Sequence, residues 1–137
     1  MNIGMRRNRN YLGDKLLLYS AAASMFIAGL LHLALVPMFF KEMPLNVMIF
    51  FIVSGLAQMF WVIPIIKKWI FPWYYIGIGG TVVLIILWVV VIPGSGYPIH
   101  GTDMAIEVAQ IAFIILALII IKRNPSEAKS TKLDIDL

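Results

Sequence analysis

The sequence predicts an all-α transmembrane four-helix bundle, and three observations carry that prediction. Four long apolar runs each approach the ~20 residues that an α-helix needs to cross about 30 Å of hydrocarbon. The composition is 61% hydrophobic and 13% charged, whereas a soluble domain has about 25% charged residues. Ten of the eleven Lys and Arg residues fall on one side of the implied membrane. One transmembrane domain, residues 16–121, therefore accounts for most of the chain.

The first predicted span, about residues 16–40, follows a basic segment of residues 1–15. This start is similar to a signal peptide. However, the apolar run is longer than the roughly 7–15 residues of a signal's hydrophobic region, and no small-x-small cleavage site follows it. We therefore predict a retained first helix.

The second and third predicted spans, about residues 45–66 and 73–92, have short connections, which favour antiparallel neighbours and an up-down bundle. Pro72 is predicted to start the third helix, where its missing N–H costs little. Small and polar residues should meet on the bundle axis, because small side chains let helices approach closely. These residues are Ser20, Ser24, Ala28 and His32, then Ser54, Gly55 and Gln58, then Gly77, Gly80 and Thr81.

The fourth predicted span, about residues 104–121, follows the longest loop, residues 93–103, and precedes a polar tail, residues 122–137. Thr102 or Asp103 can cap the fourth helix, since side chains of both types can accept a hydrogen bond from a first-turn N–H. Asp103, Glu107 and Gln110 share one helical face at positions i, i+4 and i+7. A polar stripe is therefore predicted to enter the bundle from the loop side.

The distribution of positive charge predicts the orientation. Basic residues precede the first span, lie between the second and third, and follow the fourth, while Lys41 alone lies on the other side. Short loops rich in Lys and Arg stay cytoplasmic, so both termini are predicted to be cytoplasmic and the spans to cross the cell membrane. Aromatic residues crowd the second connection, as an interfacial belt does; they are Trp61, Trp69, Trp73, Tyr74 and Tyr75.

The chain has a net charge of +4, and its basic residues lie beside the apolar spans and form no separate basic patch. This favours the lipid bilayer, with its anionic headgroups, as a partner and gives no support for nucleic acid. Cys is absent, which excludes disulfides, thiolate metal sites and thiol nucleophiles. No Ser–His–Asp spacing, HExxH motif or paired carboxylates within a span occur, so we predict that the protein is not an enzyme.

Polar residues inside apolar helices are the candidate site, because each needs compensation in a bilayer. His32 and Glu107 share a depth in the outer leaflet, and adjacent helices would bring them together. Two interpretations are open: a hydrogen-bonded pair that fixes two helices, or a site that exchanges protons or binds a cation. The predicted buried polar pocket comprises His32, Glu107, Gln110, Gln58 and Ser54.

A metal site is a further hypothesis. His100 and Asp103 from the outer loop would join His32 and Glu107 as nitrogen and oxygen ligands. The sequence requires no metal or other cofactor, and these four residues are candidates only.

Three sequence elements resemble those of small four-helix membrane proteins of microbial genomes. They are His32-Leu33, the run FIVSGLAQMFWVIP with Gly55, Gln58 and Trp61, and AIEVAQIAF with Glu107 and Gln110. The resemblance implies a four-helix bundle and no established activity.

Taken together, the sequence favours a non-catalytic accessory or assembly component, or a small binding component, with a polar pocket in the outer leaflet. Its partners would be a larger membrane complex or further copies of the chain. One alternative is an oligomeric transporter or channel for a cation, a proton or a small solute. The other is a redox subunit that binds a metal or a quinone.

Overall fold

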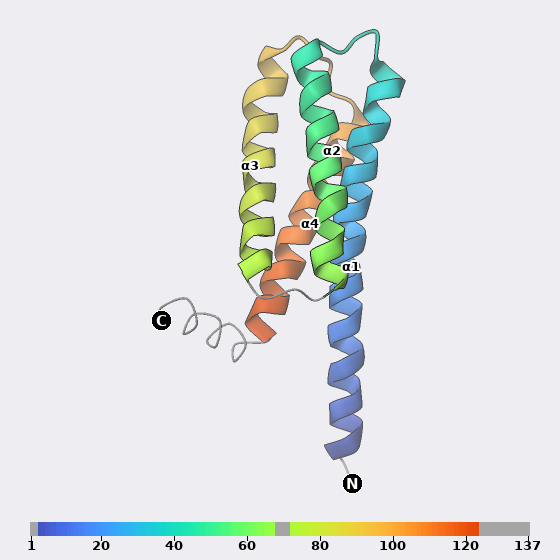
Figure 1. The fold of residues 1–137 in the computed structure, drawn as a ribbon, viewed down its shortest axis with the longest axis vertical. Coiled ribbons are helices and arrows are strands. Elements are labelled where there is room, and N and C mark those ends of the chain that lie inside the picture. Colours follow the sequence, from blue (N-terminus) through green and yellow to red (C-terminus); the bar gives the residue numbers. More distant parts are fainter. Residues whose placement is uncertain (1–2, 68–71, 124–137) are drawn as a thin grey trace.

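The computed structural model describes the backbone of residues 3–67 and 72–123, and the side chains of residues 12–67 and 72–123. In these ranges the chain forms four α-helices and no strand: α1 (Ile3–Phe39), α2 (Leu45–Ile66), α3 (Pro72–Gly94) and α4 (Gly101–Arg123). Successive helices run in opposite directions along the long axis (Figure 1). The predicted all-α four-helix bundle is confirmed. The start of the basic segment (residues 1–2), Trp69 with the rest of the second connection (residues 68–71) and most of the polar tail (residues 124–137) lie outside the described residues.

The four helices are long and apolar enough to cross a membrane. α2 has the predicted bounds, and α3 begins at Pro72 as predicted. α1 is much longer than the predicted span, because its helix continues through the basic segment back to Ile3. At ~1.5 Å per residue it extends about 55 Å, and its N-terminal part projects beyond the other helices (Figure 1). Its apolar part is Leu12–Phe39.

The loop before α4 is shorter than predicted, because α3 continues through Pro93 to Gly94 and α4 begins at Gly101. Thr102 and Asp103 both lie inside α4, so neither is the N-cap residue, although Asp103 does cap the helix as expected. The carbonyl of His100 accepts the first helical hydrogen bonds, from the N–H groups of Asp103 (3.1 Å) and Met104 (3.4 Å). Asp103 instead caps from inside the first turn, where its Oδ2 accepts the N–H of His100 at 2.7 Å.

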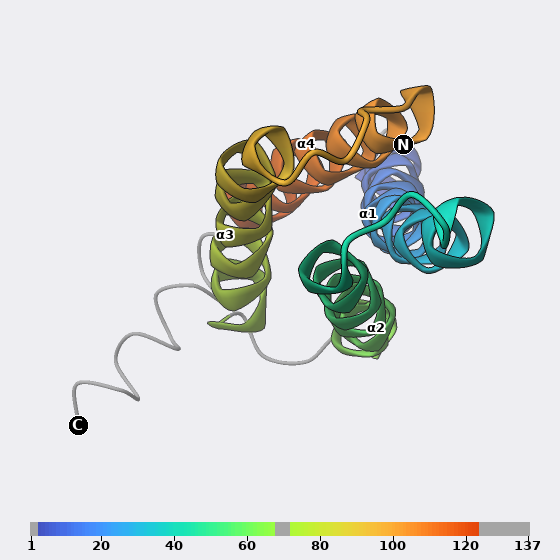
Figure 2. The ribbon, with the colours of Figure 1, turned by 90° about the horizontal axis from the view of Figure 1, so that it is seen from above.

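The helices form a ring in which α1 packs against α2 and α4, and α3 completes the ring through smaller contacts with α4 and α2 (Figure 2). α3 is the least buried of the four spans. Gly77 and Thr81 face the bundle, but Gly80, which we expected there too, is exposed, and a Cβ atom added to it would have no neighbour within 4 Å. The expectation for Gly80 fails because α3 buries only a narrow strip of its surface.

Two apolar core clusters fill the bundle at different depths. We name the two ends of the bundle after Lys67 and His100. The cluster at the Lys67 end includes Met25, Ile65, Tyr74 and Phe113. The cluster at the opposite end, the His100 end, includes Leu35, Phe51, Ile92 and Ile106. On every helix, buried polar residues fall between the two clusters. This central polar layer consists of His32, Ser54, Gln58, Thr81, Glu107 and Gln110.

Candidate functional site

The structure buries all five residues of the predicted polar pocket, and α1, α2 and α4 each supply at least one of them. α3 adds Thr81, which the sequence placed on the bundle axis but not in the pocket. The Thr81 hydroxyl donates to the Gly77 carbonyl of its own helix at 2.8 Å. Thr81 is therefore satisfied locally, which leaves α1, α2 and α4 to form the candidate site.

His32 does not pair with Glu107. Its Nδ1 donates to the Ala28 carbonyl of α1 at 2.9 Å, and the described residues contain no hydrogen bond or ion pair between His32 and Glu107. Because a carbonyl only accepts, a neutral His32 carries its proton on Nδ1 and leaves Nε2 as an acceptor. The ring packs edge-on against Phe51, with 5.6 Å between the ring centres.

Gln58 of α2 lies beside His32. The Gln58 amide N–H is close enough to interact with the His32 ring, but neither Nε2 nor Oε1 of Gln58 reaches full hydrogen-bond geometry with any group among the described residues. The amide oxygen is therefore the Gln58 atom left to accept from a group that enters the layer, because an amide oxygen accepts and cannot donate.

α4 carries a row of three further buried acceptors. Asp103 Oδ1, Glu107 Oε1 and Gln110 Oε1 have no hydrogen-bond partner in the described part of the chain. The three residues are 0%, 7% and 1% exposed. A buried polar atom without a partner costs about 1–3 kcal/mol. We call these three atoms the acceptor row; the sequence predicted the polar stripe but not that its oxygens lack donors.

An aromatic cap lies beside Asp103, at the His100 end of the acceptor row. The His100 ring stacks on Phe39 of α1, with 3.8 Å between ring centres, and shares a 3.1 Å hydrogen bond between its Nδ1 and the Tyr97 hydroxyl. His100 Nδ1 also lies 3.6 Å from Asp103 Oδ2. Burial, together with the charges of Asp103 and Glu42, raises the pKa of Tyr97 to about 12.

Tyr97 and Phe39 were not predicted as site residues. For Tyr97 the sequence did offer a signal. Tyr97 stands three residues before His100 in a short loop, and this spacing can bring the two side chains together. Phe39 gave no signal, because only the contact between α1 and the loop places it on His100.

The four candidate metal ligands do not converge. His100 and Asp103 are adjacent, but His32 is held by its own helix and Glu107 lies one turn beyond Asp103 on α4. Among the described residues, no group of three or more His, Cys, Asp or Glu side chains is arranged to hold a metal ion.

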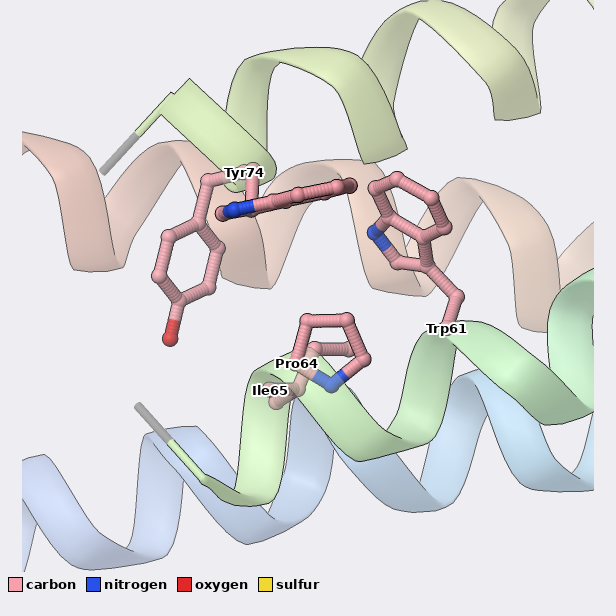
Figure 3. Close-up of a pocket in the computed structure, with 5 residues that line it drawn as sticks. Trp61, Pro64, Ile65 and Tyr74 are labelled. Carbon is pink, nitrogen blue, oxygen red and sulfur yellow. The ribbon is translucent and has the colours of Figure 1, made fainter. Parts of the chain in front are cut away.

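A second feature is a hollow between α2 and α3 near the Lys67 end (Figure 3). It is lined by Trp61, Pro64, Ile65, Trp73 and Tyr74. The Trp61 ring lies against Gly77, and a Cβ atom at that position would collide with the indole. The aromatic residues predicted for an interfacial belt thus include three that line this hollow.

The fold and these sites define a multi-pass, all-α membrane protein with a polar layer inside its bundle. Comparison of the chain with protein-family models, with curated proteins and with solved structures finds no match. The functional argument therefore rests on the side chains themselves.

Proposed function

We propose that the protein is a non-catalytic binding component of the cell membrane, and that its interior binds a small cationic solute that donates hydrogen bonds. The observation that carries the proposal is the acceptor row: the buried and unpartnered oxygens of Asp103, Glu107 and Gln110. A cation with N–H groups would supply the missing donors and balance the carboxylate charge.

The length of the acceptor row favours an organic cation over a single metal ion. Asp103 and Gln110 are seven residues apart, about 10 Å along the helix at ~1.5 Å per residue. A metal ion holds its oxygen ligands at about 2.0–2.6 Å, so one ion cannot engage the whole row without large side-chain movement. An amine or diamine can place several donors along that length.

The proposed orientation places both termini in the cytoplasm, so that the His100 end faces outward. A solute would then enter from outside, beside the aromatic cap of Phe39, Tyr97 and His100. The central polar layer ends at the Lys67-end cluster, whose buried residues are apolar. This arrangement supports binding from one side more than passage across the membrane.

Thermal unfolding of the detergent-purified protein tests the proposal. The probes are ammonium, 1,4-diaminobutane and tetramethylammonium chlorides, the last a cation without N–H donors. A ligand that binds only the folded state adds about 2.7 kcal/mol at 100 times its Kd. We expect ammonium or diaminobutane to raise the Tm saturably, and tetramethylammonium to have no effect.

Two variants make this test specific to the acceptor row. Glu107→Gln keeps an acceptor oxygen at that position but removes the charge, and should abolish the shift. Glu42→Gln removes an exposed carboxylate near the same end and should retain it. Equal shifts with all three cations, no shift with any, or a shift that survives Glu107→Gln would refute the proposed ligand class.

A second candidate function, an accessory subunit, is supported by α3. Its exposed face carries Gly79 and Gly80, which have open space around them, and small residues allow close packing of membrane helices. Gel filtration in mild detergent would then show an assembly larger than one chain. Gly80→Leu should disrupt that assembly, and Val108→Leu on the exposed face of α4 should not.

A further inference from the structure

His100 lies at the centre of the aromatic cap and contacts three parts of the chain. Its ring is stacked on Phe39 of α1, with 3.8 Å between ring centres and 25° between the planes. Its Nδ1 lies 3.1 Å from the Tyr97 hydroxyl and 3.6 Å from Oδ2 of Asp103 on α4. The side chain of His100 is 24% exposed, whereas that of Asp103 is 0% exposed. His100 can therefore exchange a proton with water while it lies against a buried carboxylate.

These contacts can hold a positively charged imidazole. A protonated Nδ1 can only donate, and the Tyr97 oxygen is an acceptor at hydrogen-bond distance. The Asp103 carboxylate supplies the opposite charge, and the face of the Phe39 ring attracts a cation stacked on it. When His100 is protonated, the chain itself thus places a cation at one end of the acceptor row.

The carboxylate of Asp103 belongs to both sites. Its Oδ2 accepts the backbone N–H of His100 at 2.7 Å, while its Oδ1, in the acceptor row, has no hydrogen-bond partner among the described residues. An imidazolium at Oδ2 balances the charge that the row would offer to a cation from outside. The two positive charges would also repel each other at short range. A proton on His100 and a cation on the row therefore compete for one carboxylate.

We propose that protonation of His100 prevents cation binding at the acceptor row. This inference rests on the proposed function and adds its regulation. A neutral His100 leaves the charge of Asp103 to the row, so the site binds its cation above the pH range in which histidines titrate. Below that range the imidazolium takes the place of the cation at Asp103, and the cation is released.

The other ionisable groups around His100 determine which controls are needed. Tyr97, whose pKa is about 12 and reflects burial and the charges of Asp103 and Glu42, stays neutral below about pH 8 and contributes no change there. Phe51 of α2 packs on Tyr97 and carries no charge. The carboxylates of Glu42, Asp103 and Glu107 remain, and their protonation could also weaken cation binding in acid. A test must separate their titration from that of His100.

Binding of 1,4-diaminobutane at about pH 8 and about pH 5.5 tests the proposal, because both amino groups of this ligand stay protonated over the range. The Kd is obtained from the dependence of the Tm on ligand concentration in detergent. For the wild type we expect the Kd to be at least about fivefold higher at the lower pH, the smaller end of the usual coupling between two sites.

Three variants assign the effect to His100. His100→Gln cannot gain a proton and should show the same Kd at both pH values. His100→Arg keeps a positive charge at both and should bind weakly at both. Glu42→Gln removes a neighbouring carboxylate that lies outside the acceptor row and should keep the pH dependence of the wild type.

The possible failures are distinguishable. If diaminobutane binds to the wild type at neither pH, the proposed function fails and this inference fails with it. If the wild type binds equally at both pH values, only the inference is overturned. A pH dependence that persists in His100→Gln would overturn it as well, since the titrating groups would then be the carboxylates. Tight binding by His100→Arg would show that a positive charge at this position does not compete.

Discussion

The backbones of Gly29 in α1 and Gly55 in α2 are in direct contact. A Cβ atom on Gly55 would lie 2.9 Å from the Gly29 carbonyl oxygen and 2.7 Å from Cγ of Leu33, closer than such atoms approach in real proteins. The absence of side chains on both residues lets the two helices pack at this depth. The contact lies beside the central polar layer and helps to set Phe51 of α2 against His32.

We expect Gly55→Ala to destabilise the bundle, because the new methyl group can be accommodated only if backbone atoms move. The cost of such overpacking is about 1–3 kcal/mol. Gly80→Ala is the control, since a Cβ there meets no other atom within 4 Å. Thermal unfolding in the same detergent compares them. Equal stability of the two variants would mean that the helices do not approach at Gly55.

Glu107→Met should stabilise the ligand-free protein. The substitution keeps a side chain of similar length and removes a buried oxygen that has no partner in the described part of the chain, so it should add about 1–3 kcal/mol to the unfolding free energy. Val108→Met, on the exposed face of the same helix, should change little. A large loss of stability in Glu107→Met, measured by denaturant unfolding, would show that Glu107 is a structural residue.

Tyr97 should make stability depend on pH in the alkaline range. Its pKa is about 12 in the folded protein and about 10 in an unfolded chain. The folded state therefore keeps the full contribution of the neutral phenol below about pH 10, and loses it as the pH rises toward about 12. Between these values the Tm of Tyr97→Phe should fall less steeply than that of the wild type. Tyr75→Phe, at an exposed tyrosine, should follow the wild type.

Single cysteines can report the orientation, because the natural chain contains none. Ile99→Cys lies in the loop at the His100 end, and Lys67→Cys at the opposite end; both positions are exposed. We expect a membrane-impermeant maleimide to label Ile99→Cys on intact cells, and Lys67→Cys only after the cells are permeabilised. The reverse pattern would place both termini outside.

Much of the architecture follows from local properties of the sequence. Hydrophobic length predicts where spans exist, because a helix must cover the whole hydrocarbon thickness; α2 accordingly has the predicted bounds, Leu45–Ile66. The prolines and short loops predict antiparallel neighbours. Burial of Ser54, Gln58 and Gln110 was also foreseeable, since polar groups in a membrane avoid lipid. The start of α1 at Ile3 was not foreseeable, because a basic helix outside the bilayer lacks the apolar run from which a span is predicted.

The sequence by itself thus determined the class of protein, the number of predicted spans and the set of polar residues that must turn inward. Only the tertiary structure decided which of these residues meet. In the structure, His32 bonds to its own helix and Gly80 lies on the exposed face of α3. One carboxylate oxygen of Glu107 and the amide oxygen of Gln110 have no donor among the described residues. The physical reason is that these helices are apolar on nearly every side, so that their rotation about the axis is set by packing, such as the contact of Gly29 with Gly55, and not by a polar face.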